Sequence, residues 1–349
     1  MAELFVTGGD GWLGRNFLEA LRADTDEPSS LVARYKKINV LSLSDQVVEG
    51  NFEVQRSFGD IRDKDVSSEF LSGCEGGTLI NIAGVIHPKF FSREFWQVNN
   101  LAISSLAKLA FQKGMKKAVF LSSNSVCGFN NDELPMFDEC SPINPYMKYG
   151  ASKAALENNL AEISNEFPDC QVIVIRSPWF YGPFQPKRQT RFFELIRNGS
   201  FPIFGDGTHR RSMVYTENLV HGLFQSLDYE TTGFELFWIA DERPYSWNEI
   251  IATVQNIFRE DYDFDVKQAR HLPGIIPDIA RYIDGKVQNI GLYNQNIHVL
   301  SEMNLDIVCS IEKAKKVLGY RPRVEIKEGM KRSITWCVEN GFFDDFISR

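Results

Sequence analysis

Short apolar runs of strand length alternate with stretches of helical spacing through the first half of the chain. The strand-like runs cover residues 4–7, 38–43, 78–82, 117–121 and 171–175. Strands that alternate with helices form right-handed crossovers, which build a parallel sheet covered by helices on both faces. The alternation therefore predicts an α/β fold with a Rossmann-like, doubly wound parallel sheet.

A glycine-rich loop follows the first predicted strand. Gly8, Gly11 and Gly14 are spaced three residues apart, and a helix-patterned segment begins at Arg15. Such glycines permit a tight turn, a close backbone approach to a pyrophosphate, and close packing of helix on strand, while the helix N-terminus favours negative charge. The loop predicts a dinucleotide site.

The end of the second predicted strand bears on the choice of cofactor. A carboxylate there accepts hydrogen bonds from the adenosine ribose, whereas a basic residue accommodates a 2′-phosphate. Asp45 lies one position later than the carboxylate that usually binds the ribose. Arg15 or Lys37 can act as the basic residue for a 2′-phosphate, so NADP stays an alternative. We favour NAD. Asp60 and Ile61 follow a further glycine and are candidates for contacting the adenine.

The second half is less regular. From about Pro183, prolines interrupt shorter helices and loops. We expect residues 1–180 to form a dinucleotide-binding Rossmann domain, with later segments returning to the sheet, and residues 181–349 to form mainly a smaller substrate-binding lobe. The stretch 271–300 has apolar residues at helical spacing, which could cap a pocket; we favour the interpretation that they pack against the rest of the protein.

Charge and cysteine usage exclude several classes of function. The net charge of −8 has the wrong sign for a protein that coats nucleic acid or an anionic membrane, so an anionic ligand requires a local basic patch. The six cysteines are widely spaced, which predicts reduced thiols in the cytoplasm and neither disulfides nor a zinc site. We expect no metal, because the histidines lack metal-binding spacing. We also expect no signal peptide and no membrane span, because no basic stretch followed by a long apolar run begins the sequence and its apolar runs are of strand length.

Tyr149 and Lys153 are four residues apart on a predicted helix and so share one face. An ammonium beside a phenol stabilises the phenolate and lowers the pKa of the tyrosine toward the working range of an acid/base. Upstream, Ser123 and its neighbours stand where a parallel strand ends, the edge at which such sheets bind ligands. A serine there can hydrogen-bond a substrate oxygen.

The glycine loop, the serine strand end and the Tyr-x-x-x-Lys helix together resemble the extended short-chain dehydrogenase/reductase family, in its NAD-dependent epimerase/dehydratase group. The resemblance extends over essentially the whole chain. It implies that Tyr149 is the acid/base, that Lys153 binds the nicotinamide ribose, and that Ser123 orients the reacting oxygen. The remaining cofactor contacts would come from Gly8, Gly11, Trp12, Leu13, Asp60, Ile61, Ala83, Gly84 and Pro178. The family commonly pairs through a four-helix interface, so we expect a homodimer.

The substrate-binding positions are Ser123, Asn124, Ser125, His87, Trp179, Arg188 and Arg211. In the family, dehydratases carry an Asp-Glu pair where this chain has Asn124 and Ser125. We therefore expect hydride transfer at a carbinol or keto carbon, with C4 of a nucleoside-diphosphate sugar as substrate. Arg211 falls on the position that binds the diphosphate, and Arg188 can add to a basic patch.

Two alternatives remain at this point. Trp179 stands where nucleotide-sugar enzymes have an asparagine, and this favours a 3β-hydroxysteroid dehydrogenase-like enzyme acting on an apolar alcohol. A non-catalytic dinucleotide sensor or scaffold would have the same fold, because fold does not fix function. The presence of Tyr149, Lys153 and Ser123 argues against the second.

Overall fold

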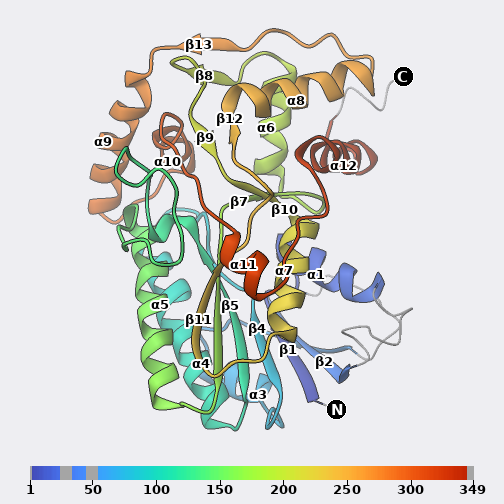
Figure 1. Cartoon of the computed structure of the whole chain (residues 1–349), viewed down its shortest axis with the longest axis vertical. Coiled ribbons are helices and arrows are strands. Elements are labelled where there is room, and N and C mark those ends of the chain that lie inside the picture. Colours follow the sequence, from blue (N-terminus) through green and yellow to red (C-terminus); the bar gives the residue numbers. More distant parts are fainter. Residues whose placement is uncertain (1, 24–33, 45–53, 344–349) are drawn as a thin grey trace.

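The computed structural model describes residues 2–23, 34–44 and 54–343. Its centre is a seven-stranded sheet in the order β11-β6-β5-β4-β1-β2-β3, in which every neighbouring pair is parallel. The strands are β1 (Ala2–Thr7), β2 (Tyr35–Ser42), β3 (Val54–Phe58), β4 (Thr78–Asn81), β5 (Lys117–Ser123), β6 (Gln171–Ser177) and β11 (Gly233–Trp238). The predicted fold class is confirmed: the strands run through the lower half of the molecule with helices on both faces (Figure 1).

Two separate apolar cores lie on the two faces of this sheet. On one face, α1 (Trp12–Ala23) and α7 (Thr216–Asp228) pack against the sheet and each other. The other face is covered by α3 (Lys64–Phe70), η2 (Phe95–Ala102), α4 (Ile103–Gln112) and α5 (Met147–Glu166). Because both faces are covered, the central strands β5 and β6 are buried almost throughout instead of alternating between apolar and polar residues.

Most of the remaining elements lie above the carboxyl ends of the strands (Figure 1), whereas α11 (Glu312–Val317) packs against β11. Those above the strands form a third apolar core from α6 (Lys187–Arg197), α8 (Trp247–Glu260) and α12 (Ile326–Glu339). Short paired strands connect them, namely β7 (Trp179–Tyr181) with β10 (Met213–Tyr215), β9 (Arg210–Arg211) with β12 (Tyr245–Ser246), and β8 (Pro202–Phe204) with β13 (Arg270–Leu272). The division of the chain at residue 180 stays a prediction. In the described part of the chain, no helix combines the length and the apolar character that a membrane span requires.

The stretch 271–300 contains two packed helices, α9 (Ile275–Asn289) and α10 (Gln295–Ser301). The expectation that its apolar residues pack inward is wrong for the outer side of α9, where Ile275, Ile279 and Tyr282 are exposed. The inner side instead buries the polar Asp284 and Gln288. Residues of α10 line the cleft described below, as a cap on a pocket would.

Candidate active site

A cleft of about 1120 Å³ lies at the carboxyl ends of the strands, between the sheet and the helices above it. It exceeds the 300–1,000 Å³ of an ordinary small-ligand pocket, so it has room for two ligands side by side. All of the site residues predicted from the sequence line it: Gly8, Gly11, Trp12, Leu13, Asp60, Ile61, Ala83, Gly84, His87, Ser123, Asn124, Ser125, Tyr149, Lys153, Pro178, Trp179, Arg188 and Arg211. Positions far apart in the sequence therefore share one cavity.

The glycine loop forms the floor at one end of the cleft. Gly8 has a φ of 77°, and a Cβ there would lie 2.7 Å from the backbone nitrogen of Ala83. A Cβ on Gly14 would lie 2.0 Å from the carbonyl oxygen of Gly8. Because side chains are sterically barred at both positions, backbone stays open to the cleft and α1 begins directly beside it at Trp12. This cradle fits the pyrophosphate of a dinucleotide.

Beyond the glycine loop, the cleft wall carries a carboxylate that the sequence analysis did not single out. The Asp10 Oδ2 atom accepts hydrogen bonds from the amide and the hydroxyl of Ser44, at 3.1 and 2.9 Å. Asp10 thus stands beside the end of β2, where a ribose-binding carboxylate is expected. Asp45, the residue predicted for that role, lies outside the described residues. Of the basic alternatives, Arg15 lines the cleft and Lys37 does not.

Asp60 lines the same end of the cleft with its charge already partnered. Its carboxylate accepts hydrogen bonds from Arg62, with both oxygens 3.0 Å from the guanidinium Nε. The Arg62 side chain holds the pKa of Asp60 below its usual range. An adenine amine would therefore meet an acceptor that is shared with Arg62.

At the other end of the cleft, β5 and α5 bring Ser123, Tyr149 and Lys153 together. Ser123 ends β5, and its Oγ accepts a hydrogen bond from the Ser125 amide at 3.2 Å. Tyr149 and Lys153 lie in the first turns of α5. The Lys153 Nζ donates to the Leu121 carbonyl oxygen at 2.8 Å. A Cβ added to Gly84 would lie 3.6 Å from the same Nζ atom. The ammonium is thus anchored to β5, two residues before Ser123.

Burial shifts the pKa of both titratable groups. It raises the pKa of Tyr149 to about 12, although a hydrogen bond with the Ser123 side chain opposes the shift. It lowers the pKa of Lys153 to about 8, and the charge of Glu157, one turn further along α5, opposes that shift. The shift of Tyr149 is opposite to the lowering that the sequence analysis expected from Lys153, because burial disfavours the charged form of each group.

The third wall carries the predicted substrate residues. Arg211 is buried, and its Nη2 donates to the carbonyl oxygen of Glu302 at 2.7 Å, while Nη1 lies 3.7 Å from the Glu302 carboxylate. Its guanidinium also lies over the Trp247 ring, 5.2 Å from the centroid. Arg188 on α6 is more exposed, and Trp179 on β7 contacts Phe192 edge-on with ring centroids 5.1 Å apart.

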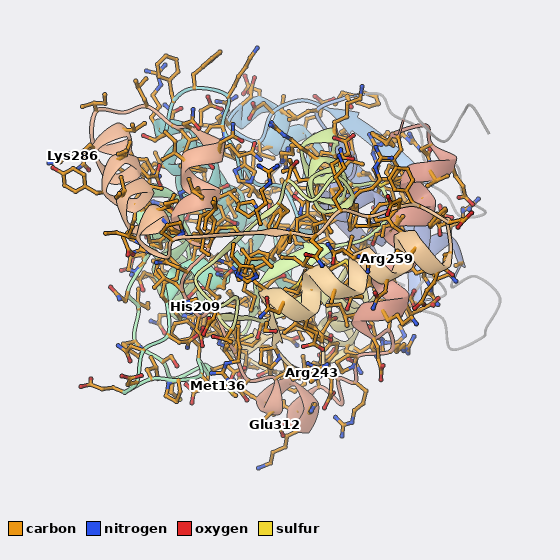
Figure 2. The ribbon with its side chains drawn as sticks, turned by 90° about the horizontal axis from the view of Figure 1, so that it is seen from above. Met136, His209, Arg243, Arg259, Lys286 and Glu312 are labelled. Atoms are coloured by element: carbon orange, nitrogen blue, oxygen red, sulfur yellow. The ribbon has the colours of Figure 1, made fainter. Side chains whose placement is uncertain are left out.

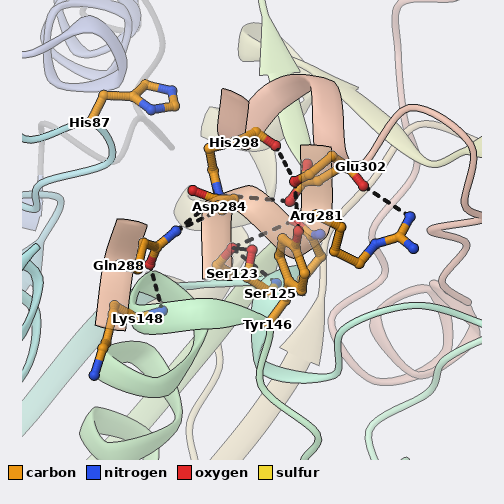
Figure 3. A network of polar contacts seen from close by, with 12 residues as sticks. His87, Ser123, Ser125, Tyr146, Lys148, Arg281, Asp284, Gln288, His298 and Glu302 are labelled. Atoms are coloured by element: carbon orange, nitrogen blue, oxygen red, sulfur yellow. Dashed lines mark hydrogen bonds and ion pairs between the residues drawn. The ribbon is translucent and has the colours of Figure 1, made fainter. Parts of the chain in front are cut away.

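Two further groups of the cleft were missed by the sequence analysis: His298 on α10 and Glu302, the residue that follows α10. The His298 Nδ1 lies 2.7 Å from Asp284 Oδ2, and its Nε2 lies 3.9 Å from Glu302 (Figure 3). Burial alone would lower the pKa of His298, but the hydrogen bond with Asp284 and the nearby carboxylates outweigh it, so the pKa is raised. Their spacing is ordinary for a helix, so the sequence gives no signal for them.

His87, by contrast, is an uncharged member of the cleft wall. Burial, aided by the charge of Arg188, lowers its pKa to about 3. Its Nδ1 lies 2.6 Å from the Tyr293 hydroxyl. His87 therefore offers a neutral ring edge to a substrate. Across the described ranges, no three acidic, histidine or cysteine side chains are grouped to hold a metal ion.

Comparison with known proteins agrees with this geometry. The model of the NAD dependent epimerase/dehydratase family matches residues 4–237. An uncharacterized protein of Sinorhizobium fredii, y4nL, is 40% identical over 97% of this chain and 96% of its own length. An Escherichia coli N-acetyl-alpha-D-glucosaminyl-diphospho-ditrans,octacis-undecaprenol 4-epimerase is 25% identical over 81% of each chain. The chain belongs to the NAD dependent epimerase/dehydratase family.

Solved structures share the fold over nearly the full length. The dTDP-glucose 4,6-dehydratase DesIV of Streptomyces venezuelae, solved with NAD, has a TM-score of 0.74 at 22% identity and covers 99% of both chains. The UDP-glucuronic acid 4-epimerase of Bacillus cereus, also solved with NAD, has a TM-score of 0.72 at 18% identity and covers 97% of this chain and 99% of its own. At such identities the likeness shows the fold.

Proposed function

We propose that this protein uses NAD to transfer a hydride at C4 of a nucleoside-diphosphate sugar, as an epimerase or a keto-sugar reductase. One observation carries the proposal: Tyr149, Lys153 and Ser123 line the same cleft as the glycine loop. A dinucleotide whose pyrophosphate lies on that loop would reach the phenol with its nicotinamide end. Fold alone would leave the chemistry open, whereas this constellation supports a reaction at a carbinol.

Proton transfer at the carbinol oxygen is the work of Tyr149. Bound NAD would supply the hydride acceptor and donor. The Tyr149 Oη takes the proton of the substrate hydroxyl during oxidation and returns it during reduction, while Ser123 Oγ hydrogen-bonds the same substrate oxygen. With a pKa of about 12 in the protein alone, the phenol needs positive charge beside it to ionise near neutral pH. Lys153 supplies part of that charge as long as it is protonated.

Asp10 supports NAD over NADP as the cofactor. Its carboxylate is held by Ser44 beside the end of β2, where the adenosine ribose of a dinucleotide on the glycine loop would lie. A carboxylate accepts hydrogen bonds from ribose hydroxyls and repels a 2′-phosphate. The NAD named in the related solved structures supports the same choice.

A sugar diphosphate suits the substrate end of the cleft. Arg188 and Arg211 both line it, and arginine binds phosphate oxygens well. Three of the proteins named above are, by their names, enzymes of diphosphate-linked sugars, and two of these three are 4-epimerases. Asn124 and Ser125 replace the Asp-Glu pair of the family's dehydratases, which favours epimerisation or reduction over loss of water.

A second candidate is oxidation or reduction of an apolar alcohol, as in hydroxysteroid-type enzymes. The cleft wall around Trp179 supports it, because Phe192 and Trp247 extend the aromatic surface. A ketoreductase of Stigmatella aurantiaca, which is 22% identical over 93% of this chain, acts on a farnesylated quinoline according to its name. Such a substrate would not need Arg188.

We also propose a homodimer in the cytoplasm. Trp96 and Leu101 on η2 are exposed, and η2 packs against α5, as the helices of a four-helix interface would. Light scattering with size-exclusion chromatography tests this: a single species of twice the chain mass supports it, and a monomer contradicts it.

Replacing Tyr149 with phenylalanine tests the proposed chemistry. The holoprotein is assayed with NAD and a panel of UDP-, GDP- and dTDP-sugars and steroid alcohols. We expect Tyr149→Phe to lower kcat by roughly 10²–10⁴-fold on the active substrate, because general acid/base catalysis is lost. NAD affinity should stay near that of the wild type.

Tyr146→Phe is the matched control, because it removes a nearby hydroxyl that bonds Ser301 instead of facing the reaction. It should retain most of the activity. Full turnover by Tyr149→Phe, or no turnover of any sugar or alcohol by the wild type, would contradict the proposal. In the second case, retained NAD binding would favour a non-catalytic sensor.

A further inference from the structure

Helix α9 exposes large apolar side chains and buries two polar ones beside Pro277 and Ala280. A surface helix normally buries its apolar stripe and exposes its polar residues. In α9, Asp284 and Gln288 are buried, whereas Ile275, Ile279 and Tyr282 are 62%, 52% and 69% exposed. These three lie at positions i, i+4 and i+7, so they share one face. The buried carboxylate bonds His298 beside the cleft (Figure 3), which fixes the orientation of the helix.

The exposed apolar face continues past the end of α9. Ile290 is 74% exposed, and the segment after it runs beside Phe90 and Phe91, which are 58% and 45% exposed. Backbone hydrogen bonds from Tyr293 to Phe90 and from Ser92 to Gly291 join the two segments. We call this patch the α9 surface and define it as Ile275, Ile279, Tyr282, Ile290, Phe90 and Phe91. Patches of large apolar side chains on a protein surface mark contact sites.

Basic side chains border this patch. The cationic groups of Lys89, Arg93 and Lys286 lie 5.4, 5.0 and 5.3 Å from the ring centroids of Phe90, Phe91 and Tyr282. Lys286 extends outward from α9 in the view of Figure 2. Of the acids nearby, Asp278 is paired with Arg281 at 2.9 Å. The border is therefore basic, although the chain as a whole carries a net charge of −8.

We propose that the α9 surface docks onto an anionic membrane surface. An apolar face bordered by lysine and arginine is the pattern of a helix that lies in the headgroup region, where the apolar side chains enter the acyl boundary and the cations meet lipid phosphates. A second copy of the chain fits less well. In a two-fold contact the patch would face its own copy, which brings together two basic borders that each carry Lys89, Arg93 and Lys286.

Docking in this way places the mouth of the cleft at the membrane. Ile86 and Val299 are 38% and 44% exposed, and both also line the cleft. The chain would then lie on the bilayer without crossing it. Docking itself is independent of the proposed function, but its use, which is to present a membrane-borne substrate to Tyr149, rests on that function.

Sedimentation of the full-length protein with vesicles tests the docking. Two compositions are compared, phosphatidylcholine alone and phosphatidylcholine with about 30% phosphatidylglycerol. We expect the bound fraction on anionic vesicles to exceed that on neutral vesicles by at least about tenfold, and to fall when salt screens the basic border. The double variant Ile279→Glu/Ile290→Glu should lose at least about tenfold in binding.

The matched control is Met136→Glu/Val317→Glu, which adds the same charge at exposed apolar positions outside the α9 surface. In Figure 2, Met136 lies at a different edge of the view from Lys286. The control should bind vesicles like the wild type, and all proteins should bind NAD equally, which separates this test from that of the proposed function. Wild type that stays in solution with both vesicle types overturns the proposal. So does equal loss in both double variants.

Sedimentation velocity without vesicles tests whether a second copy of the chain covers the α9 surface. If Ile279→Glu/Ile290→Glu turns a dimer into a monomer and the wild type ignores vesicles, the α9 surface is an interface between copies and the membrane proposal is wrong.

Discussion

A buried ion pair supports the catalytic end of the cleft, and its removal gives a measurable prediction. Glu157 and Arg176 are 4% and 3% exposed. The Arg176 Nη2 donates to Glu157 Oε2 at 2.7 Å and Nε donates to Oε1 at 3.1 Å, while the Ser122 hydroxyl donates to the same Oε1 at 2.5 Å. Glu157 also lies one turn beyond Lys153, whose charge it favours.

Glu157→Leu leaves the Arg176 guanidinium buried with a single remaining bond, from Nη1 to the Cys127 sulfur at 3.3 Å. Breaking a buried pair in this way costs about 3–5 kcal/mol, because the uncompensated charge stays out of water. With an unfolding entropy of about 2.1 cal/mol/K per residue, this 349-residue chain loses about 1.4 °C in Tm per kcal/mol. We therefore expect Tm to fall by about 4–7 °C.

The double variant Glu157→Leu/Arg176→Met decides whether the loss comes from the stranded charge. Replacing both partners by apolar residues of similar volume is often neutral, so its Tm should lie within about 2 °C of the wild type. Calorimetry of the wild type, the two single variants and the double variant completes the cycle. The reasoning is refuted if Glu157→Leu changes Tm by less than about 1 °C, or if the double variant loses as much as both single variants combined.

Three further outcomes follow from the cleft. Asp10→Asn should weaken NAD binding and strengthen NADP binding, so the ratio of the two Kd values, measured by fluorescence titration, should change by about tenfold in favour of NADP. An unchanged ratio would show that Asp10 does not select the cofactor. Gly14→Ala places a Cβ 2.0 Å from the Gly8 carbonyl oxygen, so calorimetric NAD binding should be lost while circular dichroism still shows a folded protein; unchanged binding contradicts the packing argument. Burial lowers the pKa of Lys153 to about 8 from its usual 10.5, so the folded state binds fewer protons than the unfolded state between these values and stability rises with pH there. Lys153→Met should remove this rise, worth about 2 kcal/mol between pH 8 and pH 10, from denaturant unfolding at those two pH values; the same rise in the variant would assign it to another group.

The fold and the predicted cleft residues followed from patterns that are local in sequence. The strand runs and the glycine spacing are set by burial and backbone sterics, which act over a few residues. The wall contributed by α10 could not be predicted in this way. His298 and Glu302 gain their position only because α9 and α10 fold back over the end of α5, more than a hundred residues after Tyr149. Likewise, the placement of Asp10 depends on the hydrogen bonds it accepts from Ser44, which follows the end of β2.

The exposed apolar face of α9 shows why periodicity misled the sequence analysis there. Helical spacing of apolar residues identifies a face but does not say which side of the helix is buried. In α9 the buried side is chosen by Asp284, which would pay a large desolvation cost unless it bonds His298 and Gln288. Those bonds turn the carboxylate inward, and the isoleucines on the opposite face then have to point out. The same contact that raises the pKa of a histidine in the cleft thus exposes an apolar surface at its mouth.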